Sequence, residues 1–223
     1  MRRSRLPTDP VERHLRVPRT ARFFQLGQAG AQTRSLWIAC HGYGQLARTF
    51  ADALAPAMAS DRLILVPEGL NRFYLDDPRT RHGPDAPIAA SWMTREDREN
   101  EIRDHVEYLD LLVTHGVRHI GHDVPVVALG FSQGVATVSR WAALGLTSLQ
   151  RLILWGGTLP VDLPADRGLD LFRGARVTLV SGRRDKLATP DAVERDRKRL
   201  VAAAVPVDVR QHICGHVVAS QLL

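Results

Sequence analysis

Short apolar runs alternate along the chain with segments in which apolar residues recur every three to four positions. The first pattern is typical of buried strands and the second of amphipathic helices. Because the two patterns alternate, we expect βαβ units and an α/β fold with a mostly parallel sheet. The five runs that predict buried strands are residues 36–40, 63–66, 124–129, 152–155 and 177–180.

Weaker patterns complete the predicted organisation. Residues 20–26 predict an edge strand, and residues 205–209 alternate around a proline, which suits a strand at the sheet margin.

Residues 1–14 are polar and are expected to be loosely held. Residues 71–91 contain three prolines and predict a long irregular loop, of the kind that often carries function. No internal repeat or low-complexity linker interrupts the chain, so we expect one domain over residues 1–223.

The predicted helices carry start and stop signals. A helix over residues 46–59 should kink or end at Pro56, and Gly145 should end the helix after the central strand. Thr94-Arg95-Glu96-Asp97 resembles a capping box, and Thr189-Pro190 is a good N-cap and first-turn pair. The apolar faces comprise Ile102, Val106, Leu109 and Val113, then Val135, Val138 and Ala142, then Val193, Leu200, Val201 and Ala204.

Composition narrows the function classes. Of 223 residues, 44% are apolar, as in ordinary globular proteins, and no apolar run approaches the roughly 18 residues of a membrane span. The net charge is +6, but the Arg residues are spread out and mixed with acids, so we expect a solvated surface and no nucleic-acid partner. No apolar segment follows the basic start, so we expect no signal peptide and a cytoplasmic protein.

The strongest chemical signal is Gly130-Phe131-Ser132-Gln133-Gly134. A predicted strand precedes it and a helical pattern follows, which is the context that the G-x-S-x-G nucleophile elbow requires. The elbow holds its serine in a strained turn, where side chains at Gly130 and Gly134 would clash with the strand and the helix. We therefore interpret Ser132 as a catalytic nucleophile beside a helix N-terminus that favours negative charge.

A second segment fits the same chemistry. His41-Gly42-Tyr43-Gly44 follows a predicted strand, and such a turn can aim a backbone N–H at a developing oxyanion. The residue after the nucleophile supplies the other donor, so the predicted oxyanion donors are the amides of Tyr43 and Gln133. In proteins with a nucleophile elbow of this kind, the serine, the acid and the histidine follow one another in that order along the chain. His41 lies upstream of Ser132, so it is interpreted as structural.

The acid and the base should follow later strands. Asp185 comes after the strand at 177–180 and is the expected acid. His216 is the expected base, because Gly215 permits a tight turn and close approach to the serine, and His212 is its rival. In such a triad the histidine takes the serine proton and the acid orients the imidazole. The other acids considered, Asp162, Asp166 and Asp170, are interpreted as solvated, and Asp191 as a first-turn helix residue.

The other histidines and the cysteines predict no further chemistry. His115, His119 and His122 are the best alternative for a metal site, but they lead into the elbow strand from its N-terminal end, away from the serine, so we expect no metal. Cys40 and Cys214 are too few for a disulfide framework. We expect them to be unbonded small apolar fillers.

Together these segments resemble the phospholipase/carboxylesterase family of α/β-hydrolases, which includes bacterial carboxylesterases and acyl-protein thioesterases. The resemblance implies a sheet of about seven strands with helices on both faces, the triad Ser132, Asp185 and His216, and hydrolysis of carboxylic or thiol esters without a cofactor. The shared motifs, over roughly residues 35–220, are His41-Gly42-Tyr43-Gly44, Val66-Pro67-Glu68, Ala90-Ser91-Trp92, Gly130 to Gly134, Gly182 with Asp185, and Gly215-His216.

A departure from the family concerns the tail. Only seven residues follow His216, where the family tends to have a longer terminal helix. We therefore expect a helical stub that a partner chain completes, as in a homodimer.

The substrate is expected to be a small-molecule ester. Phe73, Tyr74, Trp92 and Met93 are candidate lining residues of an acyl pocket, and no long apolar lid is visible. We therefore expect a serine carboxylesterase acting on short- to medium-chain esters. An acyl-protein thioesterase or lysophospholipase, a dienelactone-hydrolase-like enzyme and a non-catalytic binding protein stay open. Ser132 disfavours the dienelactone-hydrolase-like enzyme, because those enzymes usually have cysteine at that position. The unbroken triad disfavours the non-catalytic binding protein.

Overall fold

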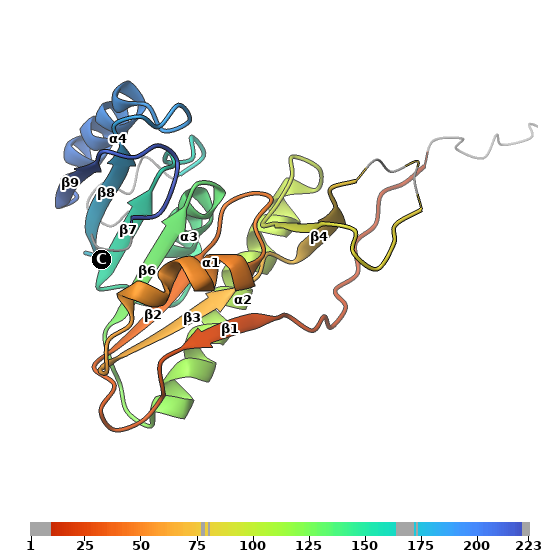
Figure 1. The fold of residues 1–223 in the computed structure, drawn as a ribbon, viewed down its shortest axis with the longest axis horizontal. Helices are drawn as coiled ribbons and strands as arrows, with labels where there is room; N and C mark the ends of the chain where they lie inside the picture. Colours follow the sequence, from red (N-terminus) through yellow and green to blue (C-terminus); the bar gives the residue numbers. More distant parts are fainter. Residues whose placement is uncertain (1–9, 77–78, 80, 164–171, 173, 220–223) are drawn as a thin grey trace, which may run out of the picture.

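The computed structural model describes residues 10–76, 79, 81–163, 172 and 174–219. Its centre is a seven-stranded sheet in the order β1-β3-β2-β6-β7-β8-β9 (Figure 1). Neighbouring strands pair in parallel, except that β1 runs antiparallel to β3. The strands are β1 (Phe23–Leu26), β2 (Ser35–Cys40), β3 (Arg62–Pro67), β6 (Val126–Phe131), β7 (Arg151–Trp155), β8 (Arg176–Gly182) and β9 (Val207–His212).

The predicted strand pattern is confirmed. Four of the five apolar runs lie within a strand, and the run 124–129 overlaps β6, which begins two residues later, at Val126; each of these strands has at least four successive buried residues. Such continuous burial is expected where helices cover both faces of a parallel sheet. The two weaker runs form the edge strands β1 and β9. Pro206 lies just before β9, where its missing N–H breaks no ladder bond, and the strand continues beyond the predicted end to His212.

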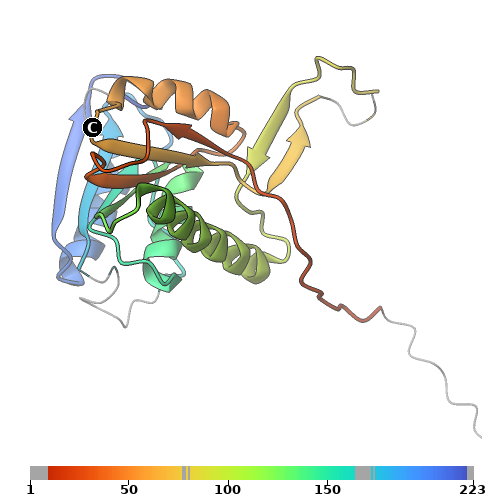
Figure 2. The ribbon, with the colours of Figure 1, turned by 90° about the horizontal axis from the view of Figure 1, so that it is seen from below.

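Helices cover both faces of this sheet (Figure 2). On one face lies α1 (Ala47–Leu54), whose Phe50 and Leu54 share a buried cluster with Trp37 and Ile64 of the sheet. The helices α2 (Arg98–Ile120), α3 (Gln133–Leu144) and α4 (Pro190–Ala202) contribute to the buried cluster of the other face. Because β2, β6, β7, β8 and β9 are parallel, their carboxyl ends lie along one rim of the sheet.

Helix boundaries follow the predicted signals at three of four places. Thr189 caps α4 by accepting a hydrogen bond from the N–H of Ala192. Gly145 follows the last residue of α3, and α1 gives way to a short 3₁₀ turn, η1 (Ala55–Ala57), which contains Pro56. The capping box at Thr94 was wrong. The Thr94 hydroxyl accepts a hydrogen bond from the Glu96 N–H, and α2 begins only at Arg98, because the local turn competes with helix formation.

The predicted apolar stripe of α4 was wrong in its last two members. Val193 and Leu200 are buried, but Val201 and Ala204 are exposed. The helix buries Asp196 instead, which accepts a hydrogen bond of 2.7 Å from the backbone N–H of Leu159. A buried polar side chain of this kind interrupts the apolar pattern that the sequence analysis relies on.

The predicted irregular loop contains regular structure. β4 (Asn71–Tyr74) and β5 (Ile88–Ser91) form an antiparallel hairpin that is separate from the main sheet. The hairpin extends away from the body of the molecule (Figures 1 and 2). Each strand has only four residues, too few for a clear alternating pattern among the surrounding prolines.

The ends of the described chain are irregular. Residues 10–14 are exposed and form no helix or strand, whereas the rest of the predicted loose segment lies outside the described residues. Residues 217–219 are not helical, and the remainder of the expected terminal stub also lies outside them. None of the helices in the described ranges has the length and apolar character that a membrane crossing requires.

Candidate active site

Ser132 occupies a strained turn between β6 and α3. Its φ of 55° and ψ of −115° lie outside the regions that residues with side chains ordinarily adopt. Its N–H donates to the carbonyl of Trp155 at the end of β7, and its own carbonyl accepts from the N–H of Val135 in α3. The surrounding structure thus enforces a conformation that is costly by itself, as is common at functional sites.

The glycines on either side of Ser132 permit this turn. A Cβ on Gly130 would lie 2.3 Å from the carbonyl oxygen of Gly134, and a Cβ on Gly134 would lie 2.2 Å from that of Cys40. Both distances are far inside van der Waals contact, and both obstacles are backbone atoms. The clash that the sequence analysis predicted is therefore a property of the structure.

Two of the predicted triad residues are in direct contact. Nδ1 of His216 lies 2.8 Å from Oδ2 of Asp185. The other carboxylate oxygen, Oδ1, accepts hydrogen bonds from the N–H groups of Leu187 and Ala188. The Asp185 carboxylate is buried, and the imidazole is partly exposed. With both oxygens committed, the carboxylate holds the His216 ring in one orientation.

The hydrogen bonds of Asp185 keep it ionised. Burial alone would raise its pKa, but the hydrogen bonds from Ala188, His216 and Leu187 together outweigh burial, so the pKa of Asp185 lies below its ordinary value of 3.8. An ionised carboxylate stabilises the imidazolium that forms when a histidine takes up a proton.

Gly156 and Gly157, which follow β7, lie close to both His216 and Ser132. A Cβ on Gly156 would lie 3.3 Å from the His216 ring, and a Cβ on Gly157 would lie 2.5 Å from the carbonyl oxygen of Ser132. The rings of Phe131 and His216 have centroids 4.8 Å apart. Ser132 and His216 are thus neighbours around one short segment at the carboxyl rim of the sheet.

Close packing between the loops that carry Asp185 and His216 depends on Gly182 more than on Gly215. A Cβ on Gly182 would lie 2.3 Å from the carbonyl oxygen of Cys214, whereas a Cβ on Gly215 would meet only the Arg184 carbonyl at 3.5 Å, an ordinary contact. The Arg184 N–H also donates to the Cys214 carbonyl. Gly182 is therefore the glycine that the contact between these two loops requires.

The rival base, His212, lies in a different environment. It is the last residue of β9, it is buried, and its ring packs on Trp155 with centroids 5.6 Å apart. Within the described residues neither ring nitrogen of His212 has a hydrogen-bond partner. Burial lowers the pKa of His212, and the Asp185 carboxylate offsets only part of this effect. None of the described residues orients this imidazole as Asp185 orients His216.

His41 is a structural residue in the turn that was predicted to carry an oxyanion donor. Its Nε2 accepts a hydrogen bond of 3.0 Å from the Gly69 N–H, so its Nδ1 carries the proton and donates to the Gly42 carbonyl at 2.8 Å. Burial lowers the pKa of His41, which favours this neutral form. With both nitrogens engaged, His41 has no free position for proton transfer.

The two predicted oxyanion donors lie on the turns expected of them. Tyr43 is in the turn after β2, and Gln133 is the first residue of α3, whose backbone N–H has no acceptor within the helix. Neither N–H donates any of the turn and loop backbone hydrogen bonds found among the described residues. A Cβ on Gly42 would lie 3.0 Å from Cβ of Ser132, so the turn also approaches Ser132 closely.

The residues expected to line an acyl pocket occupy different depths. Phe73 in the hairpin is partly buried and stacks on Tyr43, with ring centroids 5.6 Å apart. Trp92 is only 1% exposed, and its indole N–H donates to the His41 carbonyl. Met93 is partly buried, and its sulfur lies 3.2 Å from an Arg140 nitrogen. Trp92 is therefore placed beneath the turn rather than at an open surface.

A polar cluster beside Met93 was not predicted from the sequence. Asp162, interpreted as solvated, accepts two hydrogen bonds from Arg140 of α3. It also forms an ion pair with Arg98 at the start of α2. These contacts join segments far apart in the chain, so no local pattern predicts them. Asp166 and Asp170 lie outside the described residues.

Metal-binding arrangements are scarce in the described part of the chain. Glu12, His14 and Asp97 are the one group there whose donor atoms lie close enough to share an ion, and all three are exposed. Nδ1 of His119 donates to the His115 carbonyl, and Nε2 of His122 donates to the Thr33 carbonyl.

The cysteines are unbonded, as predicted. Cys40 is buried, in agreement with its expected role as a filler, and burial raises its pKa. The interpretation of Cys214 as a buried filler was wrong, because this residue is exposed on the loop that carries His216.

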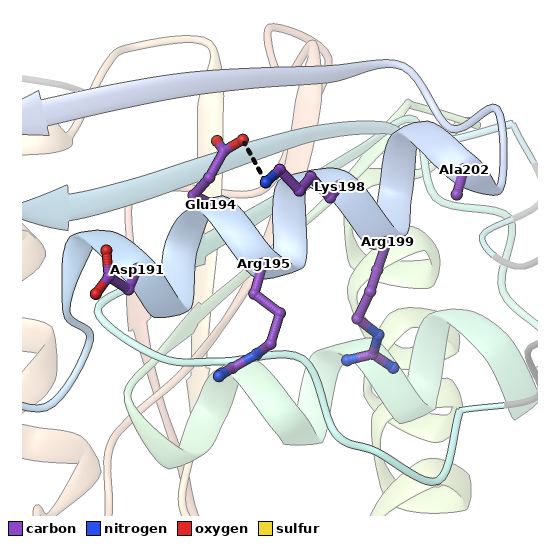
Figure 3. Close-up of a pocket in the computed structure, with 6 residues that line it drawn as sticks. All are labelled: Asp191, Glu194, Arg195, Lys198, Arg199 and Ala202. Atoms are coloured by element: carbon purple, nitrogen blue, oxygen red, sulfur yellow. Dashed lines mark ion pairs between the residues drawn. The ribbon is translucent and has the colours of Figure 1, made fainter.

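Two surface cavities lie away from the triad residues. One, of about 730 Å³, lies between residues 13–19 and α2. The other, of about 600 Å³, lies on α4 (Figure 3). There Glu194 and Lys198 pair with each other, and Arg199 donates to the carbonyls of Leu159 and Pro160. The lining residues on α4 are Asp191, Glu194, Arg195, Lys198, Arg199 and Ala202. This charged helix surface holds the segment after β7 in place.

No family model and no curated protein matches the sequence. Solved structures do match the fold. A carboxylesterase from Mesorhizobium loti shares 18% identity over 84% of this chain and 83% of its own, with a TM-score of 0.62. Acyl-protein thioesterase 2 from Zea mays shares 14% identity over 91% of this chain and 94% of its own, with a TM-score of 0.62. Esterase PE8 shares 17% identity over 90% of this chain and 93% of its own, with a TM-score of 0.62.

These similarities extend over most of each chain at low identity. This chain itself has the mostly parallel sheet and the strained serine between β6 and α3 described above. The chain therefore has the α/β-hydrolase fold.

Proposed function

We propose that this chain is a serine carboxylesterase that hydrolyses short- to medium-chain carboxylic esters. Ser132 is the nucleophile, His216 the general base and Asp185 the acid that orients it. The observation that carries the proposal is the 2.8 Å contact between His216 and Asp185, at the same rim of the sheet as the strained Ser132. The names of the structural neighbours, which include esterases and a thioesterase, support an ester bond as the substrate.

The reaction uses only groups of the chain and water. His216 takes the hydroxyl proton through Nε2 while the Ser132 oxygen attacks the acyl carbon. The carbonyl oxygen becomes an oxyanion, which the N–H groups of Tyr43 and Gln133 stabilise. His216 then gives its proton to the leaving alcohol, and an acyl-enzyme remains. Water, deprotonated by His216, attacks this ester, and the carboxylic acid leaves as Ser132 regains its proton.

The acid's geometry favours the tautomer that this reaction needs. Asp185 accepts the Nδ1 proton of His216, so Nε2 is unprotonated and can act as a base. The neighbouring His212 has no such orienting partner among the described residues.

The experiment that tests the proposal is covalent labelling with a fluorophosphonate, followed by location of the adduct. We expect one adduct, on Ser132, and no labelling of the Ser132→Ala variant. An unlabelled wild-type chain, or an adduct that survives Ser132→Ala, would contradict the proposal. Hydrolysis of p-nitrophenyl acetate, butyrate and palmitate then tests chain length, and more efficient cleavage of the palmitate would contradict the short- to medium-chain preference.

A thioesterase activity is the second candidate, because one structural neighbour is named as an acyl-protein thioesterase. The same triad attacks either carbonyl, so the active site residues alone do not separate the two. The two activities are distinguished by kcat/KM for an oxygen ester and a thiol ester that carry the same butyryl group. The carboxylesterase proposal expects the oxygen ester to be preferred.

A further inference from the structure

The foot of the hairpin contacts both predicted oxyanion segments. The foot consists of residues 90–93, at the end of β5 and directly after it. On one side it meets the oxyanion turn, defined as residues 41–44. On the other side it meets Gln133, the residue after the nucleophile. These two segments are 89 residues apart in the chain, counted from residue 44 to residue 133.

Two hydrogen bonds connect the foot to the oxyanion turn. The Gly44 N–H donates to the Ala90 carbonyl at 2.9 Å. The indole N–H of Trp92 donates to the His41 carbonyl at 2.8 Å, and the two rings lie 5.1 Å apart. Tyr43, the predicted donor, lies between these two anchored residues. The backbone on both sides of its amide is therefore fixed from the hairpin.

The side chain of Gln133 makes the other half of the connection. Its Oε1 accepts from the Trp92 N–H at 3.1 Å, and its Nε2 donates to the Ser91 hydroxyl at 3.1 Å and to the Met93 carbonyl at 3.0 Å. The Ser91 hydroxyl in turn donates to the Met93 carbonyl at 2.9 Å. The amide of Gln133 thus uses both its oxygen and its nitrogen on the foot, which fixes the start of α3.

We propose that Trp92 and the Gln133 side chain are positioning residues, which hold the two oxyanion N–H groups at a fixed separation by bonding both to the hairpin foot. This inference rests on the proposed function. Two donors stabilise an oxyanion only when both are aimed at the same point. The donors here belong to separate elements, so a third element that binds both sets their separation. Small errors in such geometry reduce the rate strongly, by about 100-fold for a displacement of about 1 Å.

The test compares two variants with a matched control. Trp92→Phe removes the indole N–H and keeps an aromatic ring in the core, and Gln133→Met removes the amide contacts and keeps the backbone N–H. The control is Trp141→Phe. Trp141 is also fully buried and donates its indole N–H at 2.8 Å, but its acceptor is Asp110 of α2. Trp141 itself lies near the end of α3, away from Ser132. Each variant is measured for folding by circular dichroism, for kcat and KM with p-nitrophenyl butyrate, and for affinity toward a short-chain trifluoromethyl ketone.

For Trp92→Phe and Gln133→Met we expect kcat to fall by about 10- to 100-fold with little change in KM. Affinity for the ketone, whose serine adduct carries the oxyanion, should fall by the same factor as kcat/KM. Trp141→Phe should lower the melting temperature but leave kcat within about twofold of wild type. If Trp92 had only a structural role, Trp92→Phe and Trp141→Phe would change kcat and the melting temperature in the same way.

The inference is overturned if Gln133→Met folds and keeps both kcat and ketone affinity within about twofold of wild type. It is also overturned if kcat falls without loss of ketone affinity, because the defect would then lie elsewhere. Should Trp92→Phe fail to fold, Gln133→Met alone decides. Failure of the proposed function is recognised separately, as absence of fluorophosphonate labelling on Ser132 of the wild-type chain.

Discussion

Asp185 holds His216 through one carboxylate oxygen and uses the other oxygen entirely on the backbone. Oδ2 lies 2.8 Å from His216 Nδ1, while Oδ1 accepts from the N–H groups of Leu187 and Ala188. The two oxygens are therefore not interchangeable, and the consequence can be tested with a substitution of almost the same shape.

Asp185→Asn should inactivate the chain without unfolding it. The backbone donors require the amide oxygen at the Oδ1 position, so the NH₂ group must face His216. The imidazole then carries its proton on Nε2 and cannot act as a base, for which we expect a loss in kcat of about 10⁴-fold. The control is Asp208→Asn, at an exposed strand position. A variant that retains a tenth of wild-type kcat would count against the assignment of Asp185.

The two histidines at the end of the sheet should respond in opposite ways. His216→Ala should abolish hydrolysis of p-nitrophenyl butyrate. His212→Phe should keep kcat within about threefold of wild type and preserve or raise stability. The His212 ring is buried and has no hydrogen-bond partner in the described part of the chain, and replacing such a group by an apolar group of similar shape costs little. Steady-state kinetics and thermal unfolding of both variants provide the measurement. Loss of activity in a folded His212→Phe variant would reverse the roles given to the two residues.

The elbow glycines should be irreplaceable for stability as well as for activity. A Cβ at Gly134 meets the Cys40 carbonyl oxygen at 2.2 Å, and neither backbone segment can move without disturbing the sheet. Gly134→Ala should therefore lower the free energy of unfolding by about 3 kcal/mol or more. Gly30→Ala is the control, since a Cβ there meets nothing within 4 Å. Urea unfolding should show a change of no more than about 0.5 kcal/mol for this control, and similar midpoints for the two variants would refute the argument.

The features predicted correctly from the sequence are those with a local cause. The strands appear as continuous apolar runs because helices cover both faces of the sheet. The elbow appears as a G-x-S-x-G pattern because a Cβ at Gly130 or Gly134 would clash with backbone atoms. These atoms lie within a few residues of Ser132 or in the adjoining strand. The cap at Thr189 depends on one hydrogen bond to a residue three positions away.

Three side chains whose contacts were not predicted have partners distant in sequence. The Asp162 carboxylate pairs with Arg140 and Arg98, neither of which lies near it in the chain. Asp196 interrupts the apolar face of α4 because the segment after β7 supplies an N–H for it. Trp92 was expected near the substrate as an aromatic residue on a loop, and its partner, the His41 carbonyl, is 51 positions away. Composition and periodicity carry no information on such pairs.

Stability should fall in acid partly because of Asp162. The hydrogen bond from Arg140 is the main cause that holds the pKa of Asp162 well below its ordinary value of 3.8, with a further contribution from Arg98 against the opposing effect of burial. The unfolded chain therefore binds a proton at a higher pH than the folded chain. The free energy of unfolding must then decrease as the pH falls below about 4.

Asp162→Asn isolates this contribution. The variant should be less stable than wild type at pH 7, by about 2 kcal/mol for a hydrogen-bonded charged pair. The difference should shrink as the pH is lowered below 3.8, because the carboxylate of the unfolded wild-type chain takes up a proton there while that of the folded chain, with its lower pKa, stays ionised. Urea unfolding between pH 2.5 and 7 measures both effects. Asp208→Asn again serves as the control, because exposed ion pairs such as that with Arg210 contribute little. A difference between wild type and Asp162→Asn that stays constant over this pH range would show that ionisation of Asp162 does not stabilise the fold.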